Sequence, residues 1–357
     1  MPGVFDILTS DGFEQVAYCH DRSTGLRAIV AIHSTELGPA LGGTRFYPYA
    51  SEDEALVDVC RLAKGMTYKH AACGNDFGGG KAVIIGDPRS MRNEALLRAY
   101  GRFVEGLNGR YMTAEDVGTT QSDMDMIRRE TAHVTGVSEA LGGSGDPSPA
   151  TALGVLWAMR AVSERQWGTP SLAGRHVVIS GVGKVGGALA AHLDAEGAKL
   201  TLSDVDEARV TALAERHGTM TVTPESSHAV PCDIFAPCAL GAVLNATTIP
   251  EMRCDAVVGA ANNQLASLAD AERLRHRSII YVPDFVANAG GVINIAEEAY
   301  GYDRDRAFTR TETIRETVHD VFSRADADGI TTTRAAELLA EERIASVGRT
   351  RLLRTHR

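Results

Sequence analysis

The sequence has no long apolar run and no excess of basic residues. No apolar run reaches the roughly 18 residues that a membrane-spanning helix requires. The 357 residues carry 36 Lys and Arg against 46 Asp and Glu, a formal net charge of −10. This balance argues against a surface built for nucleic-acid phosphates or anionic lipid. We therefore expect neither a nucleic acid nor a membrane among the partners.

Cysteine motifs and a secretion signal are also lacking. The six cysteines form no C-x-x-C pair and have no histidine at ligand spacing, so we expect reduced thiols and no bound metal. The first residues, Met1-Pro-Gly-Val-Phe-Asp6, lack the basic and apolar regions of a secretion signal. The expected location is the cytoplasm.

The length and the composition predict two globular domains. Hydrophobic residues make up 44% and charged residues 23% of the chain, both near the globular average. Roughly 100–200 residues per domain gives two domains, and the Gly/Ser/Pro stretch at 142–149 is the expected hinge. We expect residues 1–143, together with a helical tail at 329–357, to form one domain and residues 144–328 to form the other.

Hydrophobic periodicity indicates an α/β fold in both domains. Before the hinge, short β-like runs at 27–33 and 81–85 accompany a helix that opens with a Ser51/Glu54 capping box. After the hinge, strands alternate with helices, with apolar runs at 176–180, 199–203, 233–235, 256–258 and 279–282. Such alternation predicts a parallel sheet covered by helices. We expect an α/β fold in the N-terminal domain and a parallel α/β sheet in the C-terminal domain.

A glycine motif marks the cofactor site. Gly181-Val-Gly183-Lys-Val-Gly186 follows an apolar strand and opens a helix, which is the context that gives G-x-G-x-x-G its meaning. The glycines permit a tight turn and a close approach to a pyrophosphate, and the helix N-terminus attracts its charge. Asp204 ends the next strand, where its carboxylate would accept from a ribose hydroxyl and favour NAD over NADP. The predicted NAD set is Gly181, Gly183, Lys184, Val185, Gly186 and Asp204.

A second glycine cluster, Gly78-Gly-Gly-Lys81, does not fit the phosphate-loop pattern, because Asn75 and Ala82 stand where that pattern needs glycine and a hydroxyl residue. We interpret it as a rigid turn that fixes Lys81. Lys69 lies three residues after Met66 on a helix face, and Asp116 follows a short β-like run. Each alone has an ordinary structural explanation. Two lysines near one carboxylate would lower the pKa of one lysine and make it a base near neutral pH.

Taken together, the motifs resemble the Glu/Leu/Phe/Val amino-acid dehydrogenase family and look closest to its leucine and valine branch. The resemblance runs along nearly the whole chain, and it implies an N-terminal α/β substrate and oligomerisation domain and a C-terminal Rossmann dinucleotide-binding domain around a cleft. It rests on the segments 38–45, 62–69, 78–81, 114–118, 146–149, 181–186, 260–263 and 283–294.

The resemblance implies reversible, NAD-dependent oxidative deamination of an L-amino acid to a 2-oxo acid and ammonia, by a homo-oligomer. Lys69, Gly42 and Gly43 would hold the substrate carboxylate, Lys81 would activate water, and Asp116 would relay protons. Asn263, with or without Asn262, would contact the amino group and the edge of the nicotinamide. Ser148 and Thr151 would orient the carboxamide, and Asn288 would lie over the nicotinamide end.

The resemblance also indicates an aliphatic substrate. The glutamate branch has a lysine where this chain has Leu41, so an acidic side chain would find no partner. The remaining positions that the resemblance assigns to the side-chain pocket are Met66, Ala114, Thr135, Val292 and Ile295. One methylene is worth only about 1–3 kcal/mol of discrimination, so leucine, valine and isoleucine should overlap as substrates. Phenylalanine is the near alternative.

The segment from His70 to Phe77 departs from the usual branched-chain form, which has Asn at position 70 and an aliphatic pair before the glycines. His70 would add positive charge beside Lys69, and Asp76 would offset it. Two further interpretations stay open: reduction of a bulkier or N-substituted substrate, and an NAD-binding regulatory protein without turnover.

Overall fold

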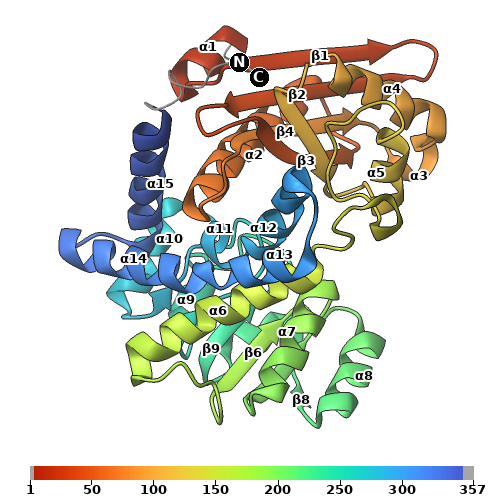
Figure 1. The fold of residues 1–357 in the computed structure, drawn as a ribbon. Coiled ribbons are helices and arrows are strands. Elements are labelled where there is room, and N and C mark those ends of the chain that lie inside the picture. The colour runs from red at the N-terminus through yellow and green to blue at the C-terminus, as the bar shows by residue number, and fades with distance from the viewer. Residues whose placement is uncertain (1–3, 349–357) are drawn as a thin grey trace. The chain divides into compact units, whose positions relative to one another are not determined.

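The computed structural model describes residues 4–348, which divide into two compact units (Figure 1). Among the described residues, the first unit contains 4–146, 295–304 and 340–348, and the second contains 147–294 and 305–339. The boundary at 146/147 lies inside the expected hinge, three residues beyond the position that we predicted. The returning tail differs more, because it begins at 340 rather than 329 and residues 295–304 also join the first unit.

The first unit is built on a mixed five-stranded sheet in the order β1-β2-β4-β3-β5. β2 runs antiparallel to both β1 and β4, and β3 runs parallel to both β4 and β5. The predicted strands at 27–33 and 81–85 are confirmed within β2 and β4. The strands are β1 (Gln15–Asp21), β2 (Leu26–Ser34), β3 (Ala40–Tyr47), β4 (Gly78–Ile85) and β5 (Tyr111–Glu115).

Helices cover both faces of this sheet. The long helix α2 (Glu52–Ala72) begins at the predicted cap, where the Ser51 hydroxyl accepts from the Glu54 amide. Its apolar stripe packs with Ile29 and Val83, whereas α4 (Glu94–Glu105) and α5 (Gln121–Ile127) pack with Val30 and Ile84 on the other face. Strand residues alternate between the faces, so the inner strands β2 and β4 are buried on both sides, whereas the edge strand β1 has no buried residue. The other helices of this unit are α1 (Val4–Asp11), α3 (Pro88–Met91) and part of α15 (Thr332–Gly348).

The glycines before Lys81 lie in a buried strand, so our interpretation of them as a turn was wrong. Each faces an obstacle to a side chain: a Cβ on Gly78 would collide with the Ser34 carbonyl, and one on Gly79 would collide with Thr67 of α2. Glycine is therefore required because neighbouring backbone approaches closely. Lys81 is fixed by sheet pairing on both sides of β4.

The second unit has a parallel six-stranded sheet in the order β11-β10-β9-β6-β7-β8, as the strand–helix alternation predicts. The predicted runs at 176–180 and 199–203 coincide with β6 (His176–Ser180) and β7 (Lys199–Ser203). The remaining strands are β8 (Met220–Thr221), β9 (Cys232–Pro237), β10 (Cys254–Val257) and β11 (Ile280–Tyr281). The helices are α6 (Ser148–Trp167), α7 (Lys184–Ala195), α8 (Glu207–His217), α9 (Thr248–Glu251), α10 (Leu268–His276), α11 (Asp284–Ala287), most of α12 (Gly290–Ala296) and α13 (Arg304–Thr311), and α14 (Thr313–Asp328).

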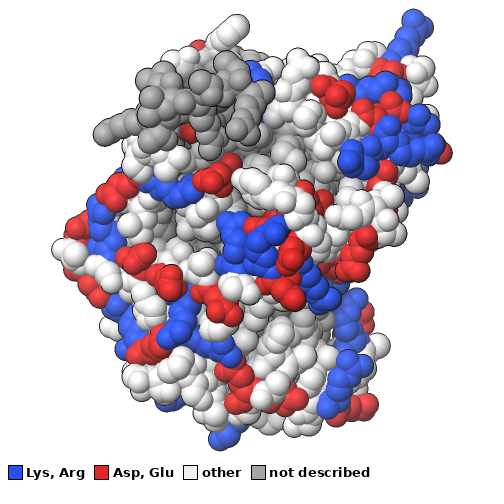
Figure 2. Space-filling model, in the orientation of Figure 1, with Lys and Arg blue, Asp and Glu red and all other residues white. Residues whose placement is uncertain are grey.

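Helix α14 explains why the tail stays with the second unit until residue 339. Its predicted stripe of Ile314, Val318, Val321 and Phe322 is buried, and Ile314 packs against Gly154 of α6. Arg165 of α6 also pairs with Asp326 at 2.8 Å. Acidic and basic side chains lie next to one another over the face in Figure 2, as such pairs require. No helix within residues 4–348 has the length and apolarity needed to cross a bilayer.

Candidate active site and dinucleotide site

Lys81 and Asp116 meet in the first unit. The Lys81 Nζ lies 3.1 Å from Asp116 Oδ2, and Arg45 Nε lies 3.2 Å from the same oxygen. β4 supplies the lysine, β3 supplies the arginine, and the loop after β5 supplies the carboxylate. The lysine side chain is only 8% exposed and the aspartate side chain 19%. The sequence prediction paired Lys81 with Asp116, but it did not include Arg45.

A tight turn holds Asp116 in place. The Thr119 hydroxyl accepts from the Asp116 amide and donates to the Thr44 carbonyl, which ties the turn to β3. Gly118 has a φ of +81°, and a Cβ there would collide with the Phe46 carbonyl. The loop therefore has little freedom to move the carboxylate away from Lys81.

The electrostatic surroundings keep Asp116 ionised. Burial by itself raises the pKa of this carboxyl group, but Lys81 and then Arg45 outweigh burial, and the resulting pKa lies below the ordinary aspartate value. A carboxylate beside two cations accepts a proton more readily once one of those cations gives up its charge or moves. This arrangement suits coupled proton transfer between Lys81 and Asp116.

The predicted carboxylate-binding residues lie around β3. A Cβ on Gly42 would approach Met66 of α2, and one on Gly43 would meet Asp116. Each Cβ would also collide with backbone, at the Gly80 carbonyl for Gly42 and at the Glu115 carbonyl for Gly43, so close packing requires glycine at both positions. Lys69 is half-buried in the last turn of α2, three residues from Met66 on the same face.

Three of the predicted pocket residues form one buried cluster. Leu41, Ala114 and Ile295 pack together with Phe77, Ala296 and the partly buried Met112. Leu41 is fully buried on β3, and Ile295 comes from the segment that rejoins the first unit. Thr135 is buried nearby along β5, where its amide donates to the Thr113 carbonyl at 2.8 Å. Val292 is half-buried and belongs to the second unit.

The unusual segment from His70 to Phe77 adds no positive charge, so that expectation was wrong. Burial lowers the pKa of His70 to about 3, and the ring is completely buried. The Asn75 amide lies 3.2 Å from its Nδ1, so Nε2 carries the proton and donates to the Leu41 carbonyl at 3.2 Å. Asp76 does not offset a charge at His70, because it pairs with Arg343 of α15 at 2.9 Å.

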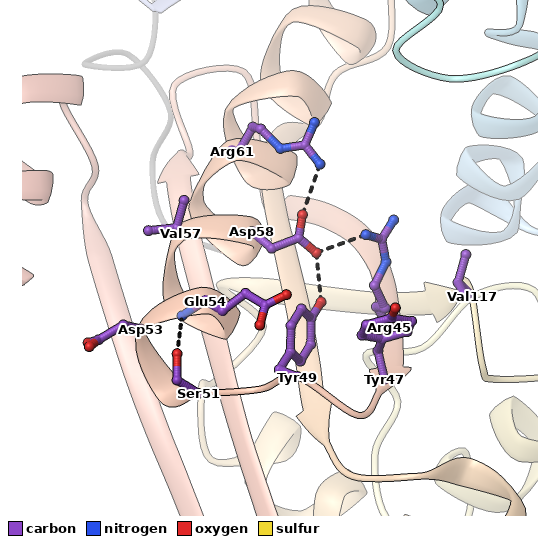
Figure 3. Close-up of a pocket in the computed structure, with 10 residues that line it drawn as sticks. All are labelled: Arg45, Tyr47, Tyr49, Ser51, Asp53, Glu54, Val57, Asp58, Arg61 and Val117. Atoms are coloured by element: carbon purple, nitrogen blue, oxygen red, sulfur yellow. Dashed lines mark hydrogen bonds and ion pairs between the residues drawn. The ribbon is translucent and has the colours of Figure 1, made fainter. Parts of the chain in front are cut away.

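A network beyond Asp116 was missed by the sequence reasoning. Arg45 Nη1 lies 2.8 Å from Asp58 on α2, and Asp58 also accepts from Tyr49 at 2.6 Å and from Arg61 at 2.9 Å. These residues line a pocket of about 740 Å³ on the first unit (Figure 3). The sequence pattern that could have indicated this network is a charged residue within an apolar strand, Arg45, and another beside the apolar stripe of a helix, Asp58.

In the second unit, the predicted glycine turn follows β6 directly. Gly181 has a φ of +102°, and a Cβ there would collide with Ala239 in the loop after β9. Gly186 contacts the Gly181 carbonyl so closely that no side chain fits, whereas the space beside Gly183 is open. α7 begins at Lys184 with Val185 half-buried in its first turn. The turn therefore offers open backbone at the N-terminus of a twelve-residue helix.

Asp204 makes structural contacts within the second unit. Its Oδ2 accepts from the Val182 amide at 2.7 Å, and its Oδ1 accepts from the Asp206 amide at 2.9 Å. Arg209 lies 3.9 Å from Asp204 Oδ1. The carboxylate thus braces the glycine turn against the end of β7, and its side chain is only 9% exposed.

The three predicted asparagines, Asn262, Asn263 and Asn288, differ in their surroundings. Asn288 Nδ2 donates to Asn262 Oδ1 at 2.8 Å and to the Ala260 carbonyl at 3.0 Å. Asn263 has a φ of +52°, and its carbonyl accepts from the Ala242 amide. Asn288 is buried, yet no described residue donates to its Oδ1. A buried amide oxygen of this kind is an acceptor that suits an amide-bearing ligand.

The remaining predicted residues lie at the start of α6. Ser148 is its first residue, and the Thr151 hydroxyl donates to the Pro147 carbonyl at 3.0 Å. A Cβ on Gly291 would meet the Thr151 hydroxyl at 2.5 Å, which places α12 and the segment after Asn288 beside this helix. The glycine turn, Asp204 and the 260–263 segment follow the carboxyl ends of parallel strands, where ligands bind in such sheets.

Two family models match the chain. Residues 14–133 match the Glu/Leu/Phe/Val dehydrogenase dimerisation domain, and residues 142–351 match the Glutamate/Leucine/Phenylalanine/Valine dehydrogenase model. Together the two matches cover most of both units.

Individual relatives are similar over nearly their whole length. A leucine dehydrogenase of Bacillus cereus is 51% identical, over 98% of this chain and 95% of that protein. A valine dehydrogenase of Streptomyces coelicolor is 51% identical, over 94% and 93%. The solved structure of L-tryptophan dehydrogenase from Nostoc punctiforme matches with a TM-score of 0.86 and 42% identity, over 97% of this chain and all of that one.

Proposed function

Because the chain belongs to the Glu/Leu/Phe/Val dehydrogenase family, as its motifs predicted, we propose that it catalyses the reversible, NAD-dependent oxidative deamination of branched-chain L-amino acids. The products are the 2-oxo acid and ammonia. The observation that carries this proposal is the 3.1 Å contact between Lys81 and Asp116, both partly withdrawn from water. The 51% identity to leucine and valine dehydrogenases supports the choice of substrate.

In this proposal, Lys81 and Asp116 move protons. In its neutral form, Lys81 takes a proton from the water that attacks the imino acid. Asp116 takes a proton from the substrate ammonium group and returns one to the departing ammonia. Lys69 neutralises the substrate carboxylate, which the backbone at Gly42 and Gly43 would also help to hold. Lys69 thus binds the substrate carboxylate, while Lys81 and Asp116 act on the other groups that join the same α-carbon.

The second unit would hold NAD, which when bound supplies a nicotinamide ring that accepts a hydride from the α-carbon. The open backbone at Gly183 and the N-terminus of α7 suit a pyrophosphate. Asp204 would accept from a ribose hydroxyl. Asn288 Oδ1 accepts no hydrogen bond from the described residues, so it suits the amide of the nicotinamide, and Asn262 is held beside Asn288 by a hydrogen bond. Ser148 and Thr151 would orient that amide, and Asn263 would contact the substrate amino group.

An apolar wall favours an aliphatic side chain. Leu41, Ala114 and Ile295 carry no charge that could pair with a substrate carboxylate, so glutamate is disfavoured. Such a wall separates aliphatic side chains by only about 1–3 kcal/mol per methylene. An aromatic substrate is the second candidate, because the L-tryptophan dehydrogenase structure is 42% identical.

A spectrophotometric screen of NADH formation with NAD and single L-amino acids tests the proposal. We expect leucine, valine and isoleucine to give values of kcat/KM within about 10–200-fold of one another, with glutamate far below. Higher values for phenylalanine or tryptophan would favour the aromatic alternative. Turnover of 2-oxo acids with alkylamines but not with ammonia would favour N-substituted products. Absence of NADH formation with every amino acid would refute the proposal.

We also propose a homo-oligomer in the cytoplasm. The first unit matches a family model described as a dimerisation domain, and the six cysteines are all free thiols. Sedimentation velocity of the full chain measures the assembly, and a monomer at micromolar concentration would refute it.

A further inference from the structure

Charged groups of alternating sign connect the proposed catalytic pair to the surface of the first unit. Lys81 contacts Asp116, Asp116 contacts Arg45, Arg45 contacts Asp58, and Asp58 contacts Arg61. The first four side chains are between 8% and 21% exposed, whereas Arg61 is 55% exposed. The series therefore runs from a shielded site to solvent.

The arginine is held at both ends of its planar group. Its Nε faces Asp116, and its Nη1 faces Asp58, whose Oδ2 also accepts from Tyr49 (Figure 3). A guanidinium presents donors in a fixed plane, so contacts at two edges fix its orientation as well as its position. An ammonium has a single nitrogen at the end of a flexible stem and cannot make the same two contacts. The geometry requires an arginine rather than a lysine.

We propose that Arg45 is a positioning residue of the reaction: anchored by Asp58, it fixes Asp116 against Lys81 and sets the pH range in which the pair works. This inference rests on the proposed function. Arg45 itself touches neither reacting atom in the scheme above. It acts by donating to Asp116 Oδ2, the oxygen that Lys81 also contacts, and so holds that oxygen beside the lysine.

The charged groups that contact Asp116 come from two strands, and a third element supplies the partner of one of them. Arg45 lies on β3 and Lys81 on β4. Asp58 on α2 lies one guanidinium further away. Loss of the Arg45 charge favours the protonated form of whichever group controls the rate, Lys81 or Asp116, because a neighbouring cation is removed. Loss of the Asp58 charge has the opposite effect, because Arg45 is then no longer partly neutralised.

Opposite shifts separate this role from general damage to the fold. We expect Arg45→Ala to lower kcat by at least about tenfold and to move the acid limb of kcat/KM upward by on the order of one pH unit. Asp58→Asn should move that limb downward. Arg45→Lys should lower kcat but leave the limb near the wild-type position, because the charge remains. Arg27→Ala is the matched control, since its pair with Glu52 is exposed on the same unit.

Chemical rescue adds a second readout. Guanidinium at low millimolar concentration should restore part of the kcat of Arg45→Ala and move its pH profile back, without effect on Arg27→Ala. If Arg45→Ala does not fold, as judged by circular dichroism, Arg45→Lys and Asp58→Asn carry the test. A pH profile of Arg45→Ala that superimposes on wild type, or shifts of Arg45→Ala and Asp58→Asn in the same direction, would overturn the inference.

Failure of the proposed function would be recognised separately. A wild-type chain that turns over no amino acid refutes that function, but Arg45 can still be judged from the reactivity of Lys81. Acylation of Lys81 by acetic anhydride, measured by peptide mass spectrometry across pH, reports the neutral amine. Acylation should be slower in Arg45→Ala and faster in Asp58→Asn at a given pH. Equal rates in both variants would overturn the inference.

Discussion

Replacement of His70 by glutamine should make the protein less sensitive to acid. His70 lies at the end of α2, where Nε2–H donates to the Leu41 carbonyl behind the proposed substrate pocket. A glutamine amide can make the same donation but cannot be protonated near neutral pH. The substitution therefore keeps the hydrogen bond to β3 and removes the titration.

The size of the effect follows from the pKa of His70, which burial lowers from 6.5 to about 3. Between these two values, the unfolded chain binds a proton at this residue and the folded chain does not, so the free energy of unfolding falls as the pH falls. Near neutral pH the contribution is almost nil. At about pH 5 the wild type should have lost about 2 kcal/mol that the variant keeps. The loss levels off only below about pH 3.

Urea unfolding followed by far-UV circular dichroism at several pH values measures this difference. His33 and His192, whose pKa values burial also lowers, are present in both proteins and cancel. The exposed His276 changed to glutamine corrects for the loss of a histidine as such. A difference between wild type and His70→Gln that stays constant from about pH 7.5 to about pH 5 would show that His70 is not held neutral.

Three further predictions concern the sites. Lys81→Ala should lower kcat by orders of magnitude with NAD affinity unchanged, whereas Lys69→Ala should mainly raise KM. Near-normal steady-state kinetics in both variants would refute the roles assigned to the two lysines. Phe77→Leu should raise kcat/KM for bulkier amino acids relative to valine by roughly tenfold, because Phe77 packs against Leu41 and Ala114. Phe103→Leu, on the opposite face of the sheet, is the control. If the ratio of kcat/KM for bulkier amino acids to that for valine is the same in both variants, Phe77 is not part of the pocket wall. Asp204→Ser should weaken NAD preference over NADP and also lower NAD affinity, because the Val182 amide loses its acceptor. Asp206→Ser is the control, since serine still caps α8 at this position. Titration calorimetry measures both affinities, and an unchanged preference in Asp204→Ser would exclude the ribose contact.

The second unit was predictable to the residue where burial is continuous. β6 and β7 are apolar runs bounded by a glycine turn and by polar loops, and their limits coincide with the prediction. Strands that are buried on both faces leave few alternatives, because any shift would expose apolar side chains. The end of the chain was less predictable, since the stripe of α14 fits any apolar surface. Which unit it joins depends on its partner, here α6.

The first unit shows how local reasoning fails for glycine. Gly78, Gly79 and Gly80 suggested a turn because three glycines carry no side chain to define a strand. In the structure, the same absence lets α2 and the Ser34 carbonyl approach β4 closely. Both interpretations follow from the missing Cβ. Only the positions of residues far away in the sequence decide between them, and a single sequence does not give those positions.

The same reason explains why Arg45 and Asp58 were missed while Lys81 and Asp116 were found. The latter pair stands in motifs that point to chemistry on their own, a lysine after glycines and an aspartate before one. Arg45 and Asp58 have partners only in three dimensions, and each has an ordinary local explanation, a strand end and a helix surface. Yet a charge is costly in a half-buried position unless it is paired. An unexplained charged residue on an apolar face therefore predicts a partner, and two such residues of opposite sign, on either side of one turn, predict each other. That rule makes Asp58 a candidate partner of Arg45, whereas the second contact of Arg45, to Asp116, depends on the parallel pairing of β3 with β5.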